Sequence, residues 1–289
     1  MEFLPWILLF LSAFLASNKN ILVKGLAGIS IKSREFFGAQ AIIFASGSIA
    51  LIIVNIFDYN GFSTLTALVS LGYGVMLIIA LWFYTLALTM GKTALCATIY
   101  SFGFVIPTLS GWLFWDEPIS ICAAIGIIIV FPVLIISGSG SKDKAQSGNK
   151  RYILYLIIAM LCSGGVGIMQ KIHQKSPYAN QKSTLILCAF LLGLVVSLIF
   201  FFIMKKSDYK ITTKASGICA LVGLLYSVCN LLNTYLAGAL DSAIFFPAIN
   251  IGAIVISMIM GLIIYKERLT KKDILVLSLG AIAIALVNL

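Results

Sequence analysis

Apolar stretches of about 20 residues recur along the whole chain, and they constrain its fold more than any other feature of the sequence. A helix needs about 20 apolar residues to cross the hydrocarbon core of a bilayer. Within that core, only segments that satisfy their own backbone hydrogen bonds avoid a large desolvation cost. The chain is 61% hydrophobic and 10% charged, which leaves too little polar surface for a water-soluble globule. The sequence therefore predicts an all-α polytopic membrane protein.

About ten transmembrane helices can be placed on these stretches. The first stretch has no basic n-region and no small-residue cleavage site, so we interpret it as mature structure rather than a signal peptide. A segment rich in Ser, Gly and charge at 138–150 is predicted to be a flexible linker between a first five-helix repeat, 1–137, and a second, 151–289. The helices are expected at 3–23, 35–57, 66–89, 92–114, 118–137, 152–172, 183–204, 214–238, 241–264 and 273–288.

The two halves share a short motif at the end of the fourth helix of each. Gly111 and Glu117 match Gly261 and Glu267 at a constant offset of 150 residues. An odd number of helices per repeat makes the second half enter the membrane from the opposite side. The halves are therefore predicted to be inverted repeats, which is an architecture typical of transporters.

The basic residues predict an orientation. Of the 20 Lys and Arg residues, Lys171, Lys175 and Lys182 lie in connections on one side and Lys19 lies within a helix, which leaves 16 on the other side. The positive-inside rule then places both termini outside the cytoplasm. This distribution also explains the formal charge of +10 without a nucleic-acid partner.

The endings at 111–120 and 261–270 both follow the pattern G-x-x-x-x-x-E-x-[IL]-[ST], and Ser17, Asn18 and Lys24 form an S-N…K pattern. With the paired five-helix halves, these motifs resemble the drug/metabolite transporter superfamily and, more narrowly, its EamA-type ten-helix transporters. The resemblance implies a carrier of amino acids, other metabolites, choline or nucleotide sugars, with a central cavity between the halves. It also implies cytoplasmic termini, contrary to the charge count.

Lys19 is the clearest ionisable residue within a predicted span, where a charge is costly and is by default a functional candidate. It shares a helical face with Ser12 and Ala16, and could meet an anionic group of a substrate in the cavity. The alternative is snorkelling, in which the long stem lifts the ammonium to the nearby interface.

Polar and aromatic stripes supply the other candidate binding residues. Tyr226, Asn230 and Asn233 lie at i, i+4 and i+7 on one face of helix 214–238, where they either line a cavity or hydrogen-bond between helices. The remaining candidates either contact substrate or belong to the core or the interfacial belt, and they are Trp82, Tyr84, Tyr100, Phe246 and Asn250. At the repeat offset Tyr100 is the counterpart of Asn250, so both are expected near the pseudo-two-fold axis.

Helix 152–172 is unusually rich in small residues. Ser163, Gly164, Gly165 and Gly167 follow one another closely, and such residues permit either close helix approach or local unwinding.

Enzymatic chemistry is not indicated. Glu35 and the other acidic residues sit at predicted helix ends, where a solvated position is the simplest interpretation. His173 is expected in the loop after helix 152–172, without the carboxylate or thiol partners of a nucleophilic or metal centre. The six cysteines are expected to be small packing residues, and no P-loop occurs. We expect no catalytic residues, no metal and no cofactor.

These features predict a secondary transporter of a small polar or aromatic metabolite, such as an amino acid, working by alternating access. The alternative is an exporter of organic cations or drugs, which the aromatic residues would recognise. The expected partners are a small-molecule substrate and the lipid bilayer, and a monomer would suffice. The expected location is the plasma membrane, as a multi-pass protein of a bacterial inner membrane.

Overall fold

The architecture is taken from a computed structural model. It describes residues 4–24, 34–91, 96, 99–115, 120–138, 150–205, 211–240, 242, 245–246, 249–250, 252–253, 256, 260 and 271–287. Most of the predicted linker at 138–150 lies outside these residues, as do Asp116, Glu117, Asp241, Gly261 and Glu267.

The described residues form helices and connections. Six helices are long and apolar enough to cross a membrane, at 4–23, 34–57, 64–90, 151–174, 179–203 and 213–239. The described residues between 242 and 260 are also helical. The elements are α1 Leu4–Lys24, α2 Arg34–Phe57, α3 Thr64–Met90, η1 Phe102–Phe104, α5 Val105–Phe114, α6 Ile121–Gly138, α7 Lys150–Gln174, η2 Ala179–Gln181, α8 Lys182–Ile203, α9 Thr213–Ala239 and α11 Lys271–Val287.

Side-chain caps define where two of the long helices begin. The Ser63 hydroxyl accepts a hydrogen bond from the Thr66 amide at the start of α3, and the Thr212 hydroxyl accepts one from the Ala215 amide at the start of α9. Each cap satisfies an amide that has no partner within its helix. Glu35 lies in the first turn of α2 and is only 8% exposed, so it is not the solvated residue that the sequence suggested.

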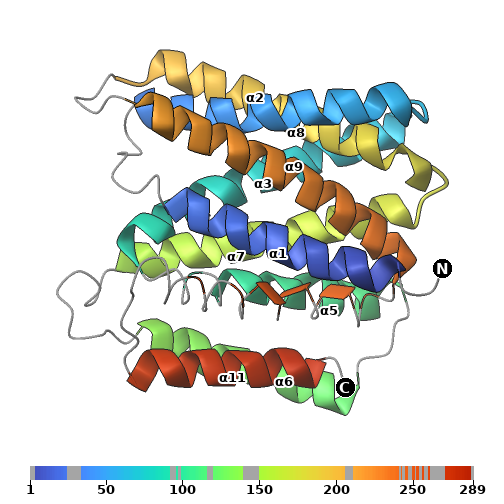
Figure 1. Cartoon of the computed structure of the whole chain (residues 1–289). Helices are drawn as coiled ribbons and strands as arrows, with labels where there is room; N and C mark the ends of the chain where they lie inside the picture. Colours follow the sequence, from blue (N-terminus) through green and yellow to red (C-terminus); the bar gives the residue numbers. More distant parts are fainter. Residues whose placement is uncertain are drawn as a thin grey trace.

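Consecutive long helices run in alternate directions, and α1 begins at the same end of the bundle at which α11 ends (Figure 1). Their main packing pairs are α1 with α9, α3 with α7, α2 with α8, α2 with α9, α3 with α8, and α6 with α11. The segment η1–α5 packs on α7. A large buried core, including Phe44, Tyr73 and Phe190, joins α2, α3, α7, α8 and α9.

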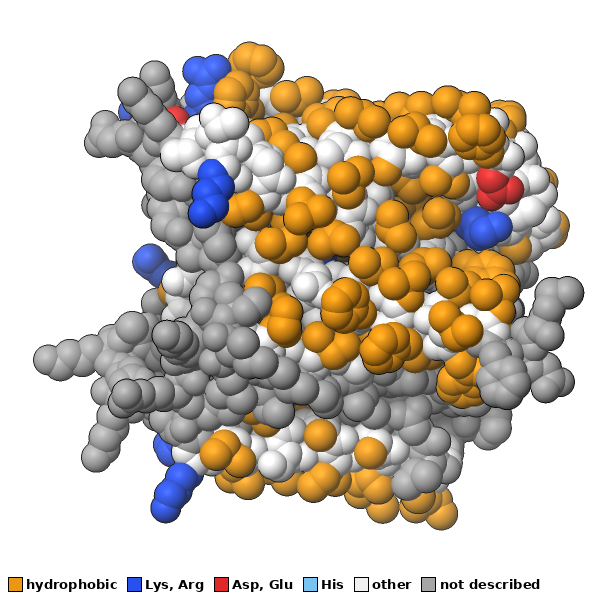
Figure 2. Space-filling model, in the orientation of Figure 1, with side chains coloured by type: hydrophobic (Ala, Val, Ile, Leu, Met, Phe, Trp, Pro, Cys, Tyr) orange, Lys and Arg blue, Asp and Glu red, His pale blue; other side chains and the backbone are white. Residues whose placement is uncertain are grey.

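Apolar side chains cover the flank of the bundle, and most of the visible Lys and Arg side chains gather at one end (Figure 2). Along α2, for example, Ile49, Ile53 and Ile56 are 53–71% exposed. Such a surface would be costly in water, whereas hydrocarbon solvates it without penalty. The surface therefore suits a bundle that is embedded in lipid.

The glycines of α7 serve close helix approach, and the helix is continuous from Lys150 to Gln174. A methyl group added at Gly164 would lie 2.6 Å from the Gly103 carbonyl oxygen of η1, and one added at Gly103 would lie 2.7 Å from the Met160 carbonyl oxygen. Ordinary contacts of this kind begin at about 3.4 Å, and real ones are essentially never below 3.0 Å. Of the two roles open to these small residues, the structure shows close packing.

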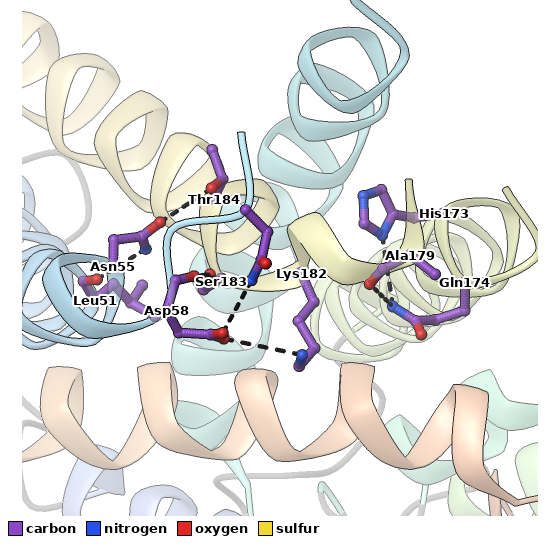
Figure 3. A network of polar contacts seen from close by, with 10 residues as sticks. Leu51, Asn55, Asp58, His173, Gln174, Ala179, Lys182, Ser183 and Thr184 are labelled. Carbon is purple, nitrogen blue, oxygen red and sulfur yellow. Dashed lines mark hydrogen bonds and ion pairs between the residues drawn. The ribbon is translucent and has the colours of Figure 1, made fainter. Parts of the chain in front are cut away.

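At the end of the bundle opposite the basic residues, the α2–α3 connection is tied to the start of α8 (Figure 3). The Ser183 hydroxyl donates to the Asp58 carbonyl oxygen (3.0 Å), and Thr184 donates to Asn55 Oδ1 (3.0 Å). Lys182 Nζ lies 3.9 Å from Asp58 Oδ2 in a partly exposed ion pair.

His173 of α7 lies at the same end of the bundle. The expectation that it lies in a loop is wrong: it belongs to the last turn of α7 and is fully buried. Its Nε2 lies 3.3 Å from the Thr66 hydroxyl, which in turn donates to Gln181 Oε1 (2.7 Å). Gln181 Oε1 also accepts from the Ser63 amide (2.9 Å). The polar partners on α3 and η2 explain why a histidine is buried here.

Candidate functional site

A cavity of about 130 Å³ lies between α1, the segment 100–107, α7, α9 and the helical residues 245, 246, 249, 250 and 253. It therefore draws its walls from both halves of the chain. The lining combines one cation, several amides and hydroxyls, and aromatic rings. These residues are Ala16, Lys19, Asn20, Leu77, Tyr100, Ser101, Gly103, Phe104, Pro107, Ser163, Val166, Gly167, Gln170, Tyr226, Cys229, Asn230, Asn233, Phe245, Phe246, Ile249, Asn250 and Ala253.

Lys19 supplies the cation, and its side chain is only 5% exposed. Its Nζ lies 4.4 Å from the centre of the Tyr226 ring and 5.9 Å from the centres of the Tyr84 and Tyr100 rings. These distances lie within the range over which an aromatic face attracts a cation. The ammonium therefore lies among three tyrosine rings in the lining of the cavity.

Packing of α1 on α9 fixes the position of Lys19. Ser12, two turns earlier on the same face of α1, donates a hydrogen bond of 2.6 Å to Asn233 Oδ1. The Ser12 hydroxyl also lies 3.4 Å from Cys229 Sγ. Because Ser12 and Lys19 are seven residues apart, anchoring one turns the other toward α9.

A buried network connects α3, α7 and α9 beside the cavity. The Tyr73 hydroxyl donates to Asn230 Oδ1 (2.6 Å), and Gln170 Nε2 donates to Tyr73 (3.3 Å) and Thr234 (3.1 Å). Asn230 Nδ2 donates to the Tyr226 carbonyl oxygen (2.7 Å). Asn230 thus lines the cavity and also holds the helices together, which combines the two roles that the sequence left as alternatives.

Two further amide side chains, Asn20 and Asn250, line the cavity. Asn20 Oδ1 is buried and has no hydrogen-bond partner in the part of the chain that the structure describes. Asn250 Nδ2 donates to the Phe246 carbonyl oxygen (2.5 Å). Phe245 and Phe246, whose ring centres are 4.8 Å apart, form an apolar wall beside Asn250.

Seven of the nine predicted site residues meet in this cavity: Lys19, Tyr100, Tyr226, Asn230, Asn233, Phe246 and Asn250. Tyr84 lies behind the lining, with its ring centre 4.5 Å from that of Tyr100. Trp82 lies elsewhere, between Phe37 of α2 and Phe200 of α8. Tyr100 and Asn250, the counterparts at the repeat offset, both line the cavity.

Several lining residues were not singled out from the sequence. Asn20 carried a signal, because it is polar and adjacent to Lys19 in a span. Phe104 and Phe245 had none, since aromatic residues are common throughout the chain. No acidic side chain occurs among the described lining residues. The lining offers a cation, hydrogen-bonding groups and aromatic faces, which suit the binding of a small molecule.

The fold and the site define a class, namely a multi-pass membrane protein with a cavity between its two halves. Residues 150–289 match the EamA-like transporter family, which belongs to the drug/metabolite transporter superfamily. The sequence resemblance is thereby confirmed.

Two further proteins are similar to this chain. An uncharacterized protein of Haemophilus influenzae strain Rd is 26% identical over 179 residues, which is 61% of this chain. The match spans 60% of that protein's own length. A protein of known crystal structure superposes with a TM-score of 0.65, covering 98% of this chain and 96% of its own, at 13% identity. The second likeness establishes the fold alone.

Proposed function

We propose that the protein is a secondary transporter that moves a small polar or aromatic metabolite, an amino acid or a similar compound, across the membrane by alternating access. The observation that carries the proposal is the convergence of Lys19, Tyr100, Tyr226 and Asn250 on one cavity. These residues come from both halves of the chain. Relative motion of the halves would therefore open the cavity to either side in turn.

The helix packing supports ten helices in two inverted repeats, 1–137 and 151–289. In these repeats the counterparts are α1 and α7, α2 and α8, and α3 and α9. Exchanging counterparts turns the α1–α9 packing into α7–α3 packing, and the α2–α9 packing into α8–α3 packing. All of these pairs occur. The pairs α2 with α8 and α6 with α11 map onto themselves, as a pseudo-two-fold axis requires.

The gathering of Lys and Arg side chains at one end of the bundle supports an orientation with both termini outside the cytoplasm. The basic side chains gather at the end where α2, α7 and α9 begin, whereas α1 begins and α11 ends at the opposite end (Figures 1 and 2). We propose that the basic end faces the cytoplasm of a bacterium and that the protein resides in the inner membrane. A reporter that is active only outside the cytoplasm should then be active when it is fused after α11.

Binding and flux test the proposed function. The purified protein would be screened against a metabolite panel by thermal shift, and the ligands found would be tested for saturable uptake into proteoliposomes. Tyr226→Phe and Asn250→Ala should weaken the uptake at least several-fold. The matched controls Tyr59→Phe and Asn180→Ala alter exposed connections and should leave it unchanged. Absence of saturable flux, or equal flux in all four variants, would refute the proposal.

Export of an organic cation is the second candidate. The observation in its favour is that three tyrosine rings already surround an ammonium group. It predicts that a neutral side chain at position 19 would leave transport intact or improve it.

A further inference from the structure

The Lys19 ammonium has three donor protons and no described hydrogen-bond acceptor. The rings of Tyr84, Tyr100 and Tyr226 lie within 6 Å of it, and Cys229 lines the same cavity. We infer that the cavity selects a small monocarboxylate with an uncharged body of about one ring, and that it discriminates against ligands with a free ammonium group. The inference rests on the proposed function and narrows it: within the proposed class of small polar or aromatic metabolites, it excludes zwitterionic amino acids.

The first step concerns cations. Aromatic faces recognise organic cations when the space over the rings is free. Here Lys19 Nζ occupies that space, 4.4 Å from the centre of the Tyr226 ring. A cationic ligand would have to displace the ammonium or lie beside it, and like charges repel strongly in a site of low dielectric. The resident lysine therefore makes the tyrosines a poor site for a second cation.

The second step concerns the missing acceptor. A buried charge without a partner is costly, and a carboxylate offers two oxygens that form short, charge-assisted hydrogen bonds with an ammonium. No described lining residue is acidic, so the ligand itself would be the source of that carboxylate. The ammonium of a zwitterionic amino acid lies next to its own carboxylate, and would therefore be brought close to Lys19.

The third step concerns the body of the ligand. A protein cavity of about 150 Å³ holds one benzene molecule. The volume here, about 130 Å³, is similar, and Phe104, Phe245 and Phe246 form its apolar wall. Asn20 Oδ1 is a hydrogen-bond acceptor without a partner among the described residues, so a hydroxyl on the body of the ligand would be favoured.

Three ligands with one skeleton test the charge requirement, namely benzoate, benzamide and benzylamine. Their dissociation constants would be measured by calorimetry on the purified full chain. We expect benzoate to bind the wild type at least tenfold more tightly than benzamide or benzylamine. Lys19→Met should remove that preference and raise the affinity for benzylamine, since the tyrosine faces become free. Lys19→Arg should retain much of the benzoate affinity. The control Lys175→Met changes an exposed lysine outside the cavity and should have no effect.

The outcomes separate this inference from the proposed function. If benzylamine binds the wild type as well as benzoate, if benzoate does not bind, or if benzoate affinity survives Lys19→Met, the monocarboxylate class is overturned. Saturable uptake of another metabolite would then leave the transporter assignment standing. If no member of the metabolite panel gives saturable flux, the transporter assignment fails and the inference fails with it. Loss of benzoate affinity in a folded Lys19→Met protein, judged by size-exclusion profile and helical circular dichroism, supports the inference.

Discussion

Alanine at Gly164 tests how closely α7 must approach η1. The new methyl group would lie 2.6 Å from the Gly103 carbonyl oxygen, and ordinary contact begins at 3.4 Å. The two elements would have to separate by about 0.8 Å, and overpacking of this kind costs about 1–3 kcal/mol. Because Gly103, Ser163 and Gly167 line the cavity, the displacement should also weaken ligand binding.

Gly217 of α9 provides the matched control. A methyl group added there meets no atom within 4 Å. Both substitutions gain about 0.5–1 kcal/mol from the helical preference of alanine over glycine. The difference between the two variants, about 1–3 kcal/mol, therefore measures the close approach alone. Unfolding titrations with SDS in mixed micelles would measure it. A Gly164→Ala protein as stable as the Gly217→Ala protein would refute the packing argument.

Three further substitutions separate structural from binding roles. Gln181→Leu leaves the partly buried Ser63 amide without its acceptor and removes the 2.7 Å hydrogen bond from Thr66, so it should lower the free energy of unfolding by about 1–3 kcal/mol in the same titration. Asp58→Asn removes an ion pair at 3.9 Å whose side chains are 25% and 47% exposed, so it should cost less than about 1 kcal/mol; a larger loss would show that the pair is better shielded than its exposure indicates. Trp82→Phe should reduce stability but leave the dissociation constant of any cavity ligand unchanged, and a several-fold change would place Trp82 in contact with the ligand.

The helices were largely predictable because each needs a long apolar run with polar residues at its ends. For α2 and α9, expected at 35–57 and 214–238, the structure has 34–57 and 213–239. Hydropathy cannot show which polar residues at a helix end are buried. His173 was placed in a loop because its neighbours are polar, yet Thr66 and the α7–α8 connection enclose it.

The site was predictable where polar residues repeat at helical spacing in an apolar helix. Tyr226, Asn230 and Asn233 belong to this group, and all three line the cavity. The sequence does not place Trp82, because an aromatic residue fits the core as well as a cavity. Its neighbours Phe37 and Phe200 come from distant parts of the chain, so only tertiary packing reveals its position.

The buried Lys19 also has an electrical consequence for a carrier of the proposed kind. With a bound monoanion beside the protonated Lys19, the cavity has no net charge while its access changes from one side of the membrane to the other. The empty cavity carries one positive charge during the same change. Each elementary charge moved through 100 mV corresponds to about 2.3 kcal/mol. The return of the empty carrier would therefore respond to membrane potential, and exchange of one anion for another would be the less costly cycle.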